Sequence, residues 1–577
     1  MDRNFWLSLL IAMSLVVGYN MYYEARFGEY LRQQEQKAAL NKKLAGTEKA
    51  ENAPASEAKT ASPEAGSLTA PEQAAAPVTS TFAPSPVESP TIVVDTGVAR
   101  AVIALNGATL SAYALNHFTD DKGKPIDLVY DATKYAQDWT ERARAAKEKG
   151  DATFSAVAPY PTLGLRFDNQ AFSTHINSAL FKTDAPAPEI KLAEGDQPLA
   201  LRFALEDASG VTVEKTMTFR SGSYEFDVSV NIVSAPKWGE FDYALVWFGL
   251  GDEHSDFSGY YSYNGPIVML ASERLAEAPD DEKPVREYQG ELRWAGMAHR
   301  YFTMFGVPRP QGERTVRASY IDDMNSTVEW IHHAGMESKP LSLAVFLGPK
   351  LHGLLNGYTE GQQSIIDYGW FDVLAKPMYW ILEMFFRWTS NWGWAIIMLT
   401  VLAKVILYPL SHKGFKSMQK LQKLQPHMKR IQEAYKGDRE KMNQEMLTLY
   451  REHKVNPLGG CMPMVIQIPI FFALYKVLLE SIELKGADFI LWIHDLSLKD
   501  PYYVTPVLMG GTMLLQQWMP PAVGDPMQRK IMMFMPVIFT VMFLSFPAGL
   551  VLYWLVNNIL SIAQQWLIYR EAKQEVK

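Results

Sequence analysis

Five long apolar stretches in the last third of this 577-residue chain constrain its fold more than any other feature. A helix needs about 20 apolar residues to cross the hydrocarbon core of a bilayer, and most of these stretches approach that length. The shortest would need its flanking residues or a locally thinned bilayer. We therefore predict five membrane-spanning helices, at 392–410, 463–479, 502–519, 531–546 and 550–568.

A sixth apolar stretch begins near the start of the chain and ends in aromatic residues typical of a membrane interface. The alternative is a cleaved signal peptide, which should carry a small-x-small cleavage site after its apolar core. The sequence Asn20-Met21-Tyr22-Tyr23 that follows this core is a poor cleavage site. We predict that residues 1–23 form an uncleaved transmembrane anchor, and Arg3 favours a cytoplasmic N-terminus.

The region between this anchor and the apolar third divides into a linker and a large β domain. Residues 24–90 are rich in Ala, Pro, Glu, Ser and Thr, a composition that cannot bury a core, so we predict a flexible linker. Apolar residues then occupy alternate positions along 211–219 and along 224–232. Lys215 occupies one of these alternate positions in the first segment. We predict a large antiparallel β-sandwich at 91–365.

The distribution of charge indicates how the chain lies in the membrane. Residues 411–460 carry eleven Lys and Arg against five acidic residues, a net charge of +6, whereas residues 24–371 carry a net charge of about −15. Basic loops remain in the cytoplasm. We therefore predict both termini in the cytoplasm and the β domain in the periplasm. A single cysteine and an external β domain suit a bacterial inner membrane.

Two segments flank the second predicted span. Apolar residues recur every three or four positions between Phe371 and Phe385, among several tryptophans, so we predict an amphipathic interfacial helix within 366–390. Its alternative is a continuation of the second span. The segment 411–460 shows the helical period from Met418 to Tyr435, then a break at Gly437-Asp438, then a second helix.

We interpret 411–460 as a cytoplasmic helical hairpin, with a solvated charged loop as the alternative. Its positive charge predicts a docking surface for the anionic ribosome or for targeting factors. The candidate docking residues are Lys420, Lys423, Lys429 and Arg430.

Polar residues within the predicted spans are candidates for function. Lys404 lies in the second span, one helical turn after Thr400. A charged side chain within a span can mark a functional site. A lysine can instead extend its long aliphatic stem so that the ammonium reaches the lipid headgroups. The residues alone leave both interpretations open. Asn557, Ser561 and Gln564 form a polar stripe in the sixth span. With Gln467 in the third, these residues predict a hydrated cavity open to the cytosol.

The chain lacks the motifs of common catalytic and metal sites. It contains no phosphate-binding loop, no HExxH and no GxSxG. Its histidines show no metal-ligand spacing, and Cys461 has no second cysteine to pair with in the chain. The net charge of −8 argues against a protein that coats nucleic acid. We expect no enzymatic activity, no cofactor, no metal and no direct sequence-specific binding of nucleic acid.

Several long motifs resemble bacterial members of the YidC/Oxa/Alb family of membrane protein insertases. They are KVNPLGGC at 454–461, QIPIF at 467–471, LWIHDL at 491–496, DPYY at 500–503, MPVIF at 535–539 and FPAGL at 546–550. The resemblance covers all six predicted spans and, more weakly, the external domain.

The resemblance implies a five-helix core at 391–577, an extra N-terminal anchor, a periplasmic β-supersandwich and a hydrophilic groove open to cytosol and lipid. Lys404 matches a groove position that is arginine in most relatives, and Tyr553-Trp554 matches a frequent Tyr-Tyr pair. The candidate groove residues are Thr400, Lys404, Gln467, Tyr553, Trp554, Asn557 and Ser561. The implied partners are nascent membrane proteins, the Sec translocon with its accessory subunits, the ribosome, the signal-recognition receptor and the lipid bilayer.

The residue patterns and the family resemblance together predict an insertase and chaperone for inner-membrane proteins, acting alone or with the Sec translocon. The alternative is a small-molecule transporter or channel with a periplasmic binding domain. Such a protein should show paired intramembrane carboxylates or inverted repeats, and the sequence shows neither. A third hypothesis, a membrane-tethered sugar-modifying enzyme, would place its chemistry in the β domain.

Overall fold

The computed structural model describes most of the chain after residue 88. The described residues are 89–120, 123–129, 160–206, 210–233, 242–249, 263–271, 273–276, 279, 283, 285–322, 325–333, 340–358, 361–453, 455, 462–519 and 526–574. The chain divides into two compact units, Met1–Thr79 and Ser80–Lys577. The predicted anchor at 1–23, almost all of the predicted linker and the motif at 456–461 lie outside the described residues.

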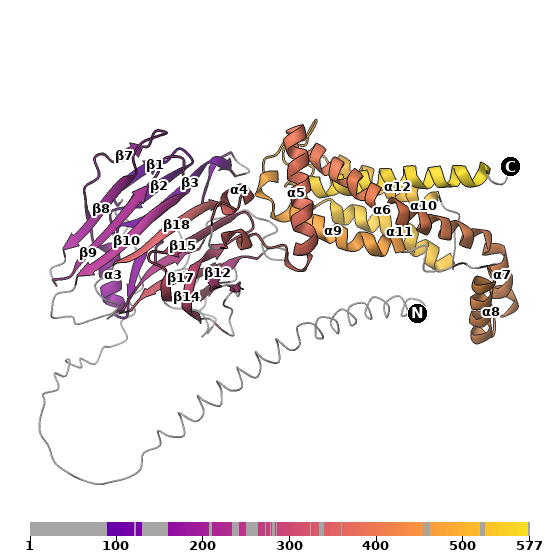
Figure 1. Cartoon of the computed structure of the whole chain (residues 1–577), viewed down its shortest axis with the longest axis horizontal. Coiled ribbons are helices and arrows are strands. Elements are labelled where there is room, and N and C mark those ends of the chain that lie inside the picture. Colours follow the sequence, from indigo (N-terminus) through magenta and orange to yellow (C-terminus); the bar gives the residue numbers. More distant parts are fainter. Residues whose placement is uncertain are drawn as a thin grey trace, which may run out of the picture. The chain divides into compact units, whose positions relative to one another are not determined.

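The β domain contains two sheets (Figure 1). The smaller sheet has the order β4-β3-β2-β1-β7, and β7 pairs with β1 in parallel, so the predicted antiparallel pairing fails at this edge. Its strands are β1 (Thr91–Asp95), β2 (Ala99–Ala104), β3 (Thr109–Thr119), β4 (Pro125–Asp127) and β7 (Glu189–Lys191).

The larger sheet has the order β5-β11-β17-β16-β14-β15-β18-β10-β9-β8-β6, with β12 paired to β13 and β14. Its strands are β5 (Gly164–Phe167), β6 (Lys182–Thr183), β8 (Leu199–Glu206), β9 (Thr212–Phe219), β10 (Glu225–Val233), β11 (Tyr243–Phe248), β12 (Gly265–Leu270), β13 (Glu273–Leu275), β14 (Val285–Ala298), β15 (Phe302–Pro308), β16 (Gly312–Asp322), β17 (Asn325–His332) and β18 (Leu341–Pro349). A short helix, α3 (Gln170–Ser178), follows β5.

The period-two pattern correctly identified β9 and β10 as neighbouring strands. They pair antiparallel, with Phe219 opposite Phe226. Alternate residues of both strands are buried, as the alternation of apolar side chains requires. Tyr113 of the smaller sheet stacks on Phe226, with ring centroids 6.0 Å apart, so the apolar core lies between the two sheets.

Lys215 on β9 is buried with its apolar neighbours, and its ammonium is fully bonded. The Nζ atom donates to the carbonyl oxygens of Leu163 at 2.6 Å, Gly107 at 2.7 Å and Ala108 at 3.3 Å. Three acceptors match the three hydrogens of an ammonium group. Because Gly107 and Ala108 lie between β2 and β3, this lysine ties the two sheets together.

The C-terminal part of the chain is helical, and its longer helices lie alongside one another (Figure 1). These are α6 (Trp392–Lys423), α9 (Met462–Glu480), α10 (Val504–Trp518), α11 (Pro526–Phe543) and α12 (Ala548–Gln574). Each overlaps one of the five predicted apolar stretches. Among the described helices, α6 alone is long and apolar enough by composition to cross a membrane.

The predicted interfacial helix corresponds to α5 (Asp372–Thr389), which is separate from α6. Ser390 adopts a left-handed conformation that ends α5, and the Asn391 side chain then accepts a hydrogen bond from the amide of Trp394. These two residues make the corner between the helices. Short helices precede α5: α4 (His352–Leu355), η1 (Gln362–Ile365) and η2 (Gly369–Phe371).

The hairpin within 411–460 differs from the prediction in its first arm. We predicted one helix from Met418 to Tyr435, but α6 continues to Lys423 and a new helix, α7 (Gln425–Ala434), follows. Pro426 stands in the first turn of α7, where its missing N–H is tolerated, and its ring prevents an unbroken helix. The predicted cap is correct: Asp438 caps α8 (Arg439–Glu452) by accepting from the amide of Lys441.

Candidate functional site

Lys404 on α6 and Ser561 on α12 meet at the interface of these helices. Lys404 Nζ donates a hydrogen bond of 2.8 Å to Ser561 Oγ, and Ser561 Oγ donates one of 2.7 Å to the backbone oxygen of Asn557. The Lys404 side chain is half-buried, and no carboxylate among the described residues forms an ion pair with it. An ammonium can donate three hydrogen bonds, so Lys404 keeps donors for water or for an incoming group.

Gln467 and Tyr553 form a second contact on the same face of α12. Gln467 Nε2 on α9 donates to the Tyr553 hydroxyl oxygen at 2.6 Å, and Tyr553 is buried. Positions 553, 557 and 561 are one helical turn apart, so Asn557 lies between the two contacts. The structure thus brings Lys404, Gln467, Tyr553, Asn557 and Ser561 together along one face.

Trp554 lies in an aromatic cluster formed by α9, α11 and α12. Its ring centroid is 4.7 Å from that of Phe471 and 5.2 Å from that of Phe543. Phe539 also packs against it. Sequence reasoning missed these phenylalanines as neighbours of Trp554, although the spacing of Phe539 and Phe543 by four residues places both on one helical face.

Thr400 occupies a different environment from the one that the sequence suggested. Its side chain is 1% exposed, and its hydroxyl donates a 2.7 Å hydrogen bond to the carbonyl of Ile396 in the same helix. A hydroxyl bonded back to its own helix presents little to a cavity. Thr400 therefore packs in the helix interface, one turn from Lys404.

Other polar residues hold α12 against its neighbours. Gln564 Nε2 donates to Ser411 Oγ at 2.8 Å, and Asn558 Nδ2 donates to Thr512 Oγ1 at 3.3 Å. Gln422 and Tyr569 make a further contact between α6 and α12. Gln564 thus contributes to helix association rather than to the face around Lys404. No local pattern in the sequence identifies the partner of Gln564, because Ser411 is 153 residues away.

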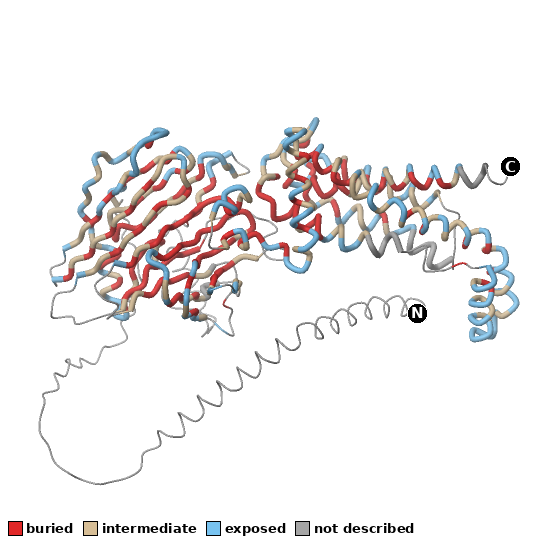
Figure 2. Tube along the Cα trace, viewed as in Figure 1, coloured by how far each residue is buried: buried red, intermediate tan, exposed pale blue. Residues whose placement is uncertain are grey.

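Packing density changes along the helices at the level of Lys404. In α6 the buried residues Trp392 to Thr400 precede it, and the next buried residue is Ser411. In α9 the residues from Ala473 onward are mostly buried, whereas 467–472 are half-buried or exposed. Figure 2 shows the same change from red to tan and blue along the helices. Among the described residues of α6 and α9, burial is thus greatest near α5 and decreases toward the other end of each helix.

The predicted docking residues lie on the surface. Lys420 and Lys423 on α6 and Lys429 and Arg430 on α7 are all exposed. Beneath them, a small apolar cluster that includes Leu424, Met428 and Leu449 holds α7 and α8 together. The structure therefore presents the four basic residues on a helical hairpin with its own small core.

Comparisons with known proteins cover both parts of the chain. A family model described as "60Kd inner membrane protein" matches residues 384–575, and one described as "YidC periplasmic domain" matches residues 160–381. "Membrane protein insertase YidC" of Syntrophus aciditrophicus is 38% identical over 88% of this chain and 90% of its own length. The protein of the same name from Geobacter sulfurreducens is 42% identical over 71% of this chain and 77% of its own length.

Proposed function

The chain belongs to the YidC family of membrane protein insertases, and we propose that it receives the polar flank of a nascent membrane protein on the face around Lys404 and Ser561. It is a membrane-integrated insertase with a periplasmic domain. The observation that carries the proposal is an ammonium held in a helix interface by a serine, with no carboxylate partner among the described residues.

We propose six spans, with 1–23 as the first and α6, α9, α10, α11 and α12 as the others. Many large apolar side chains on these helices are exposed, including Val405, Ile406, Val507, Phe534 and Ile559. Such a surface requires an apolar partner, and lipid is the partner that suits a helical bundle on all sides. The basic hairpin then faces the cytosol and the β domain the periplasm of a bacterial inner membrane.

The groove that we propose follows the sparsely packed end of the helices. Because Lys404 lies just beyond the close-packed half of α6, water and a polar chain can approach it from the cytosolic side. Its charge attracts acidic residues in the flank of the substrate. In a partly dehydrated site this attraction is stronger than in bulk water. The half-buried side chains of Gln467 and Asn557 offer further hydrogen bonds along the same wall, and the buried Ser561 orients the Lys404 ammonium.

The driving force of insertion is the transfer of the substrate's apolar segment into lipid. Burying apolar surface contributes roughly 25 cal/mol per Å². The exposed apolar helix surfaces next to the aromatic cluster around Trp554 give that segment a path out of the groove. The substrate's polar flank crosses while its apolar segment partitions, so no chemical energy source is needed for a short flank.

The positions of the other elements suggest how partners meet the groove. The exposed basic residues of the hairpin suit the ribosome and the signal-recognition receptor, both of which the family resemblance implies, as it does the Sec translocon. Three exposed side chains of α5 are Val373, Trp380 and Trp388, and the exposed Trp370 lies just before this helix. These side chains suit the lipid headgroup region.

Photo-crosslinking tests this proposal directly. A photoreactive residue at Asn557 should crosslink to the polar flank of a stalled nascent chain. The same residue at Ile559, which is exposed on the other side of α12, should not reach that flank. Crosslinks to the flank of equal strength from both positions would contradict a groove on the Lys404 face.

A further inference from the structure

The helices α10 and α11 approach each other closely at Gly510. This glycine is buried, and a β-carbon placed on it would lie 1.9 Å from Oγ1 of Thr540 on α11. Non-bonded heavy atoms pack at separations of roughly 3.5–4 Å. Only glycine therefore fits at position 510 while the two helices keep this separation.

The Thr540 side chain has no way to clear this space by rotating. Its Oγ1 donates a 2.7 Å hydrogen bond to the carbonyl of Pro536 in its own helix. Its Cβ and Cγ2 lie 3.1 Å and 3.3 Å from the same point beside Gly510, so rotation about χ1 would only exchange the atoms that clash. By contrast, a β-carbon on the exposed Gly511 would meet nothing within 4 Å.

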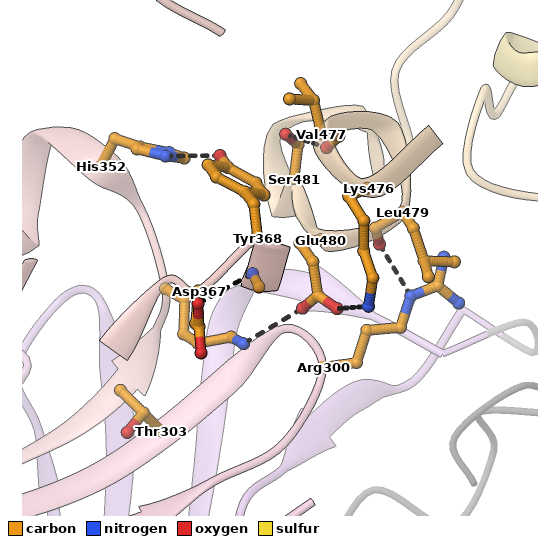
Figure 3. Close-up of polar contacts among 12 residues, drawn as sticks. Arg300, Thr303, His352, Asp367, Tyr368, Lys476, Val477, Leu479, Glu480 and Ser481 are labelled. Atoms are coloured by element: carbon orange, nitrogen blue, oxygen red, sulfur yellow. Dashed lines mark hydrogen bonds and ion pairs between the residues drawn. The ribbon is translucent and has the colours of Figure 1, made fainter. Parts of the chain in front are cut away.

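The position of α11 depends on this packing, because its described side chains provide no other anchor. From Met533 to Phe543, none of them forms a hydrogen bond or ion pair outside its own helix. Figure 3 shows the contrasting case at the end of α9, where Arg300 of the β domain donates a 2.8 Å hydrogen bond to the carbonyl of Leu479. Among the described helices, α11 packs mainly against α10.

Two rings of α11 belong to the aromatic cluster around Trp554. Phe543 is 2% exposed, and the centroids of Phe543 and Phe539 lie 5.2 Å and 6.2 Å from that of Trp554. Trp554 precedes Asn557 on α12, and Figure 1 shows α12 running away from α5 toward the C-terminus. The cluster therefore lies between the face around Lys404 and the end of the bundle near α5, which is the periplasmic end in the proposed arrangement.

We propose that Gly510 and Thr540 are positioning residues that hold α11 against α12 and so keep the aromatic cluster closed over the face around Lys404. The closed cluster separates that wet face from the periplasm. Attraction between packed rings falls steeply with separation, so a shift of α11 by about 1 Å removes much of it. The wet face rests on the proposed function, whereas the position of α11 does not.

Labelling of one cysteine from the two sides of the membrane tests the barrier in the full-length protein. Cys461 is replaced by serine, and a cysteine is placed at Asn557. A membrane-impermeant maleimide reaches the periplasmic side in spheroplasts and the cytosolic side in inverted vesicles. The parent should be labelled from the cytosolic side and not from the periplasmic side.

A distance measurement tests the position of α11 independently. Spin labels are placed at Val541 on α11 and at Ile559 on α12, both of which are exposed. Both measurements are made on the parent, on Gly510→Ala and on Gly510→Ala with Thr540→Ala, at equal protein abundance.

In Gly510→Ala the added methyl group should displace α11. We expect a longer distance between the labels and a rise of several-fold in periplasmic labelling. Thr540→Ala removes Oγ1 and Cγ2 from the contact, so the double variant should recover most of both. Gly511→Ala adds the same methyl group to the same helix in open space, and this matched control should change nothing.

Thr540→Ile adds a methyl group to the same contact from α11 and should shift both measurements in the same direction. It provides the test if Gly510→Ala does not accumulate. An unchanged distance in these variants would overturn the positioning role. A longer distance without periplasmic labelling would overturn the barrier. A parent that is silent from the cytosolic side would refute the wet face, and the barrier with it, while the distance measurement would still test the position of α11.

Discussion

The ammonium of Lys404 on α6 lies 2.8 Å from the hydroxyl of Ser561 on α12, across a sequence separation of 157 residues. This contact supports our proposal that Lys404 faces the groove, because a lysine that snorkels to the headgroups would extend away from its neighbouring helix. Lys404 instead turns toward α12, where Asn557 and Tyr553 share the same face.

The accessibility of single cysteines should map the wet side of this interface. With Cys461 replaced by serine, cysteines at Lys404 and Asn557 should react with a membrane-impermeant maleimide added from the cytosolic side. A cysteine at Ile559, which faces lipid in the proposed arrangement, should not react, because the thiolate is the nucleophile and a thiol in hydrocarbon does not ionise.

Thr400 provides an internal control for that experiment. Its side chain is 1% exposed, so a cysteine there should remain unreactive although it lies one turn from Lys404. A silent Asn557 position would indicate a dry bundle. Equal labelling at Ile559 would show that reactivity does not follow the proposed groove.

The basic hairpin should contribute to docking through its charge. Reversing Lys420, Lys423, Lys429 and Arg430 to glutamate should reduce ribosome binding by about tenfold or more at low salt, and insertion with it. These side chains are exposed, so protein abundance should not change. Co-sedimentation with ribosomes at several salt concentrations measures the effect.

Reversing Lys182 and Lys191, two exposed basic residues of the β domain, serves as the control. It should leave ribosome binding unchanged. If the hairpin variant binds ribosomes and inserts substrates normally, the charge of the hairpin has no role in docking.

The stability of the β domain should rise with pH because of Lys215. Burial lowers the pKa of this lysine to about 7. In the unfolded chain the pKa returns to about 10.4, so between these values the unfolded state binds more protons than the folded state. The contribution of Lys215 is therefore least favourable below pH 7 and improves as the pH rises toward 10, by at most about 5 kcal/mol.

Pulse proteolysis of the full-length protein in urea, from pH 7 to pH 9.5, measures this dependence. In Lys215→Met the free energy of unfolding should rise less steeply with pH than in the parent protein, whatever its value at any one pH. The substitution also leaves three carbonyl groups without a donor, which lowers stability at every pH. The dependence of stability on pH is therefore compared, and not its value at one pH. Equal slopes in the two proteins would show that Lys215 keeps its proton throughout.

Periodic features of the chain were predictable from the sequence, and pairwise contacts between distant residues were not. The alternation at β9 and β10 and the apolar stretches of α6 and α12 follow from repeated local choices, which leave a pattern in the sequence. The break between α6 and α7 could have been anticipated from Pro426, because the proline rule is local.

The contacts between Lys404 and Ser561 and between Gln467 and Tyr553 depend on the tertiary fold, and no local pattern reports them. Thr400 shows the same limit: its spacing placed it on the face of Lys404, but its hydroxyl bonds to its own helix. Lys215 was correctly placed on the buried parity of β9, yet only the fold supplies its three carbonyl acceptors.

Insertion of one substrate with acidic, neutral and basic versions of its translocated flank tests the central claim most directly. The parent and Lys404→Arg should insert the acidic version efficiently. Lys404→Glu should insert it about tenfold less well, because reversing a charge in a partly dehydrated site changes the barrier by more than 1 kcal/mol. The basic version should lose least in Lys404→Glu. Equal insertion of all three versions by Lys404→Glu would contradict a role for the Lys404 charge in receiving the substrate.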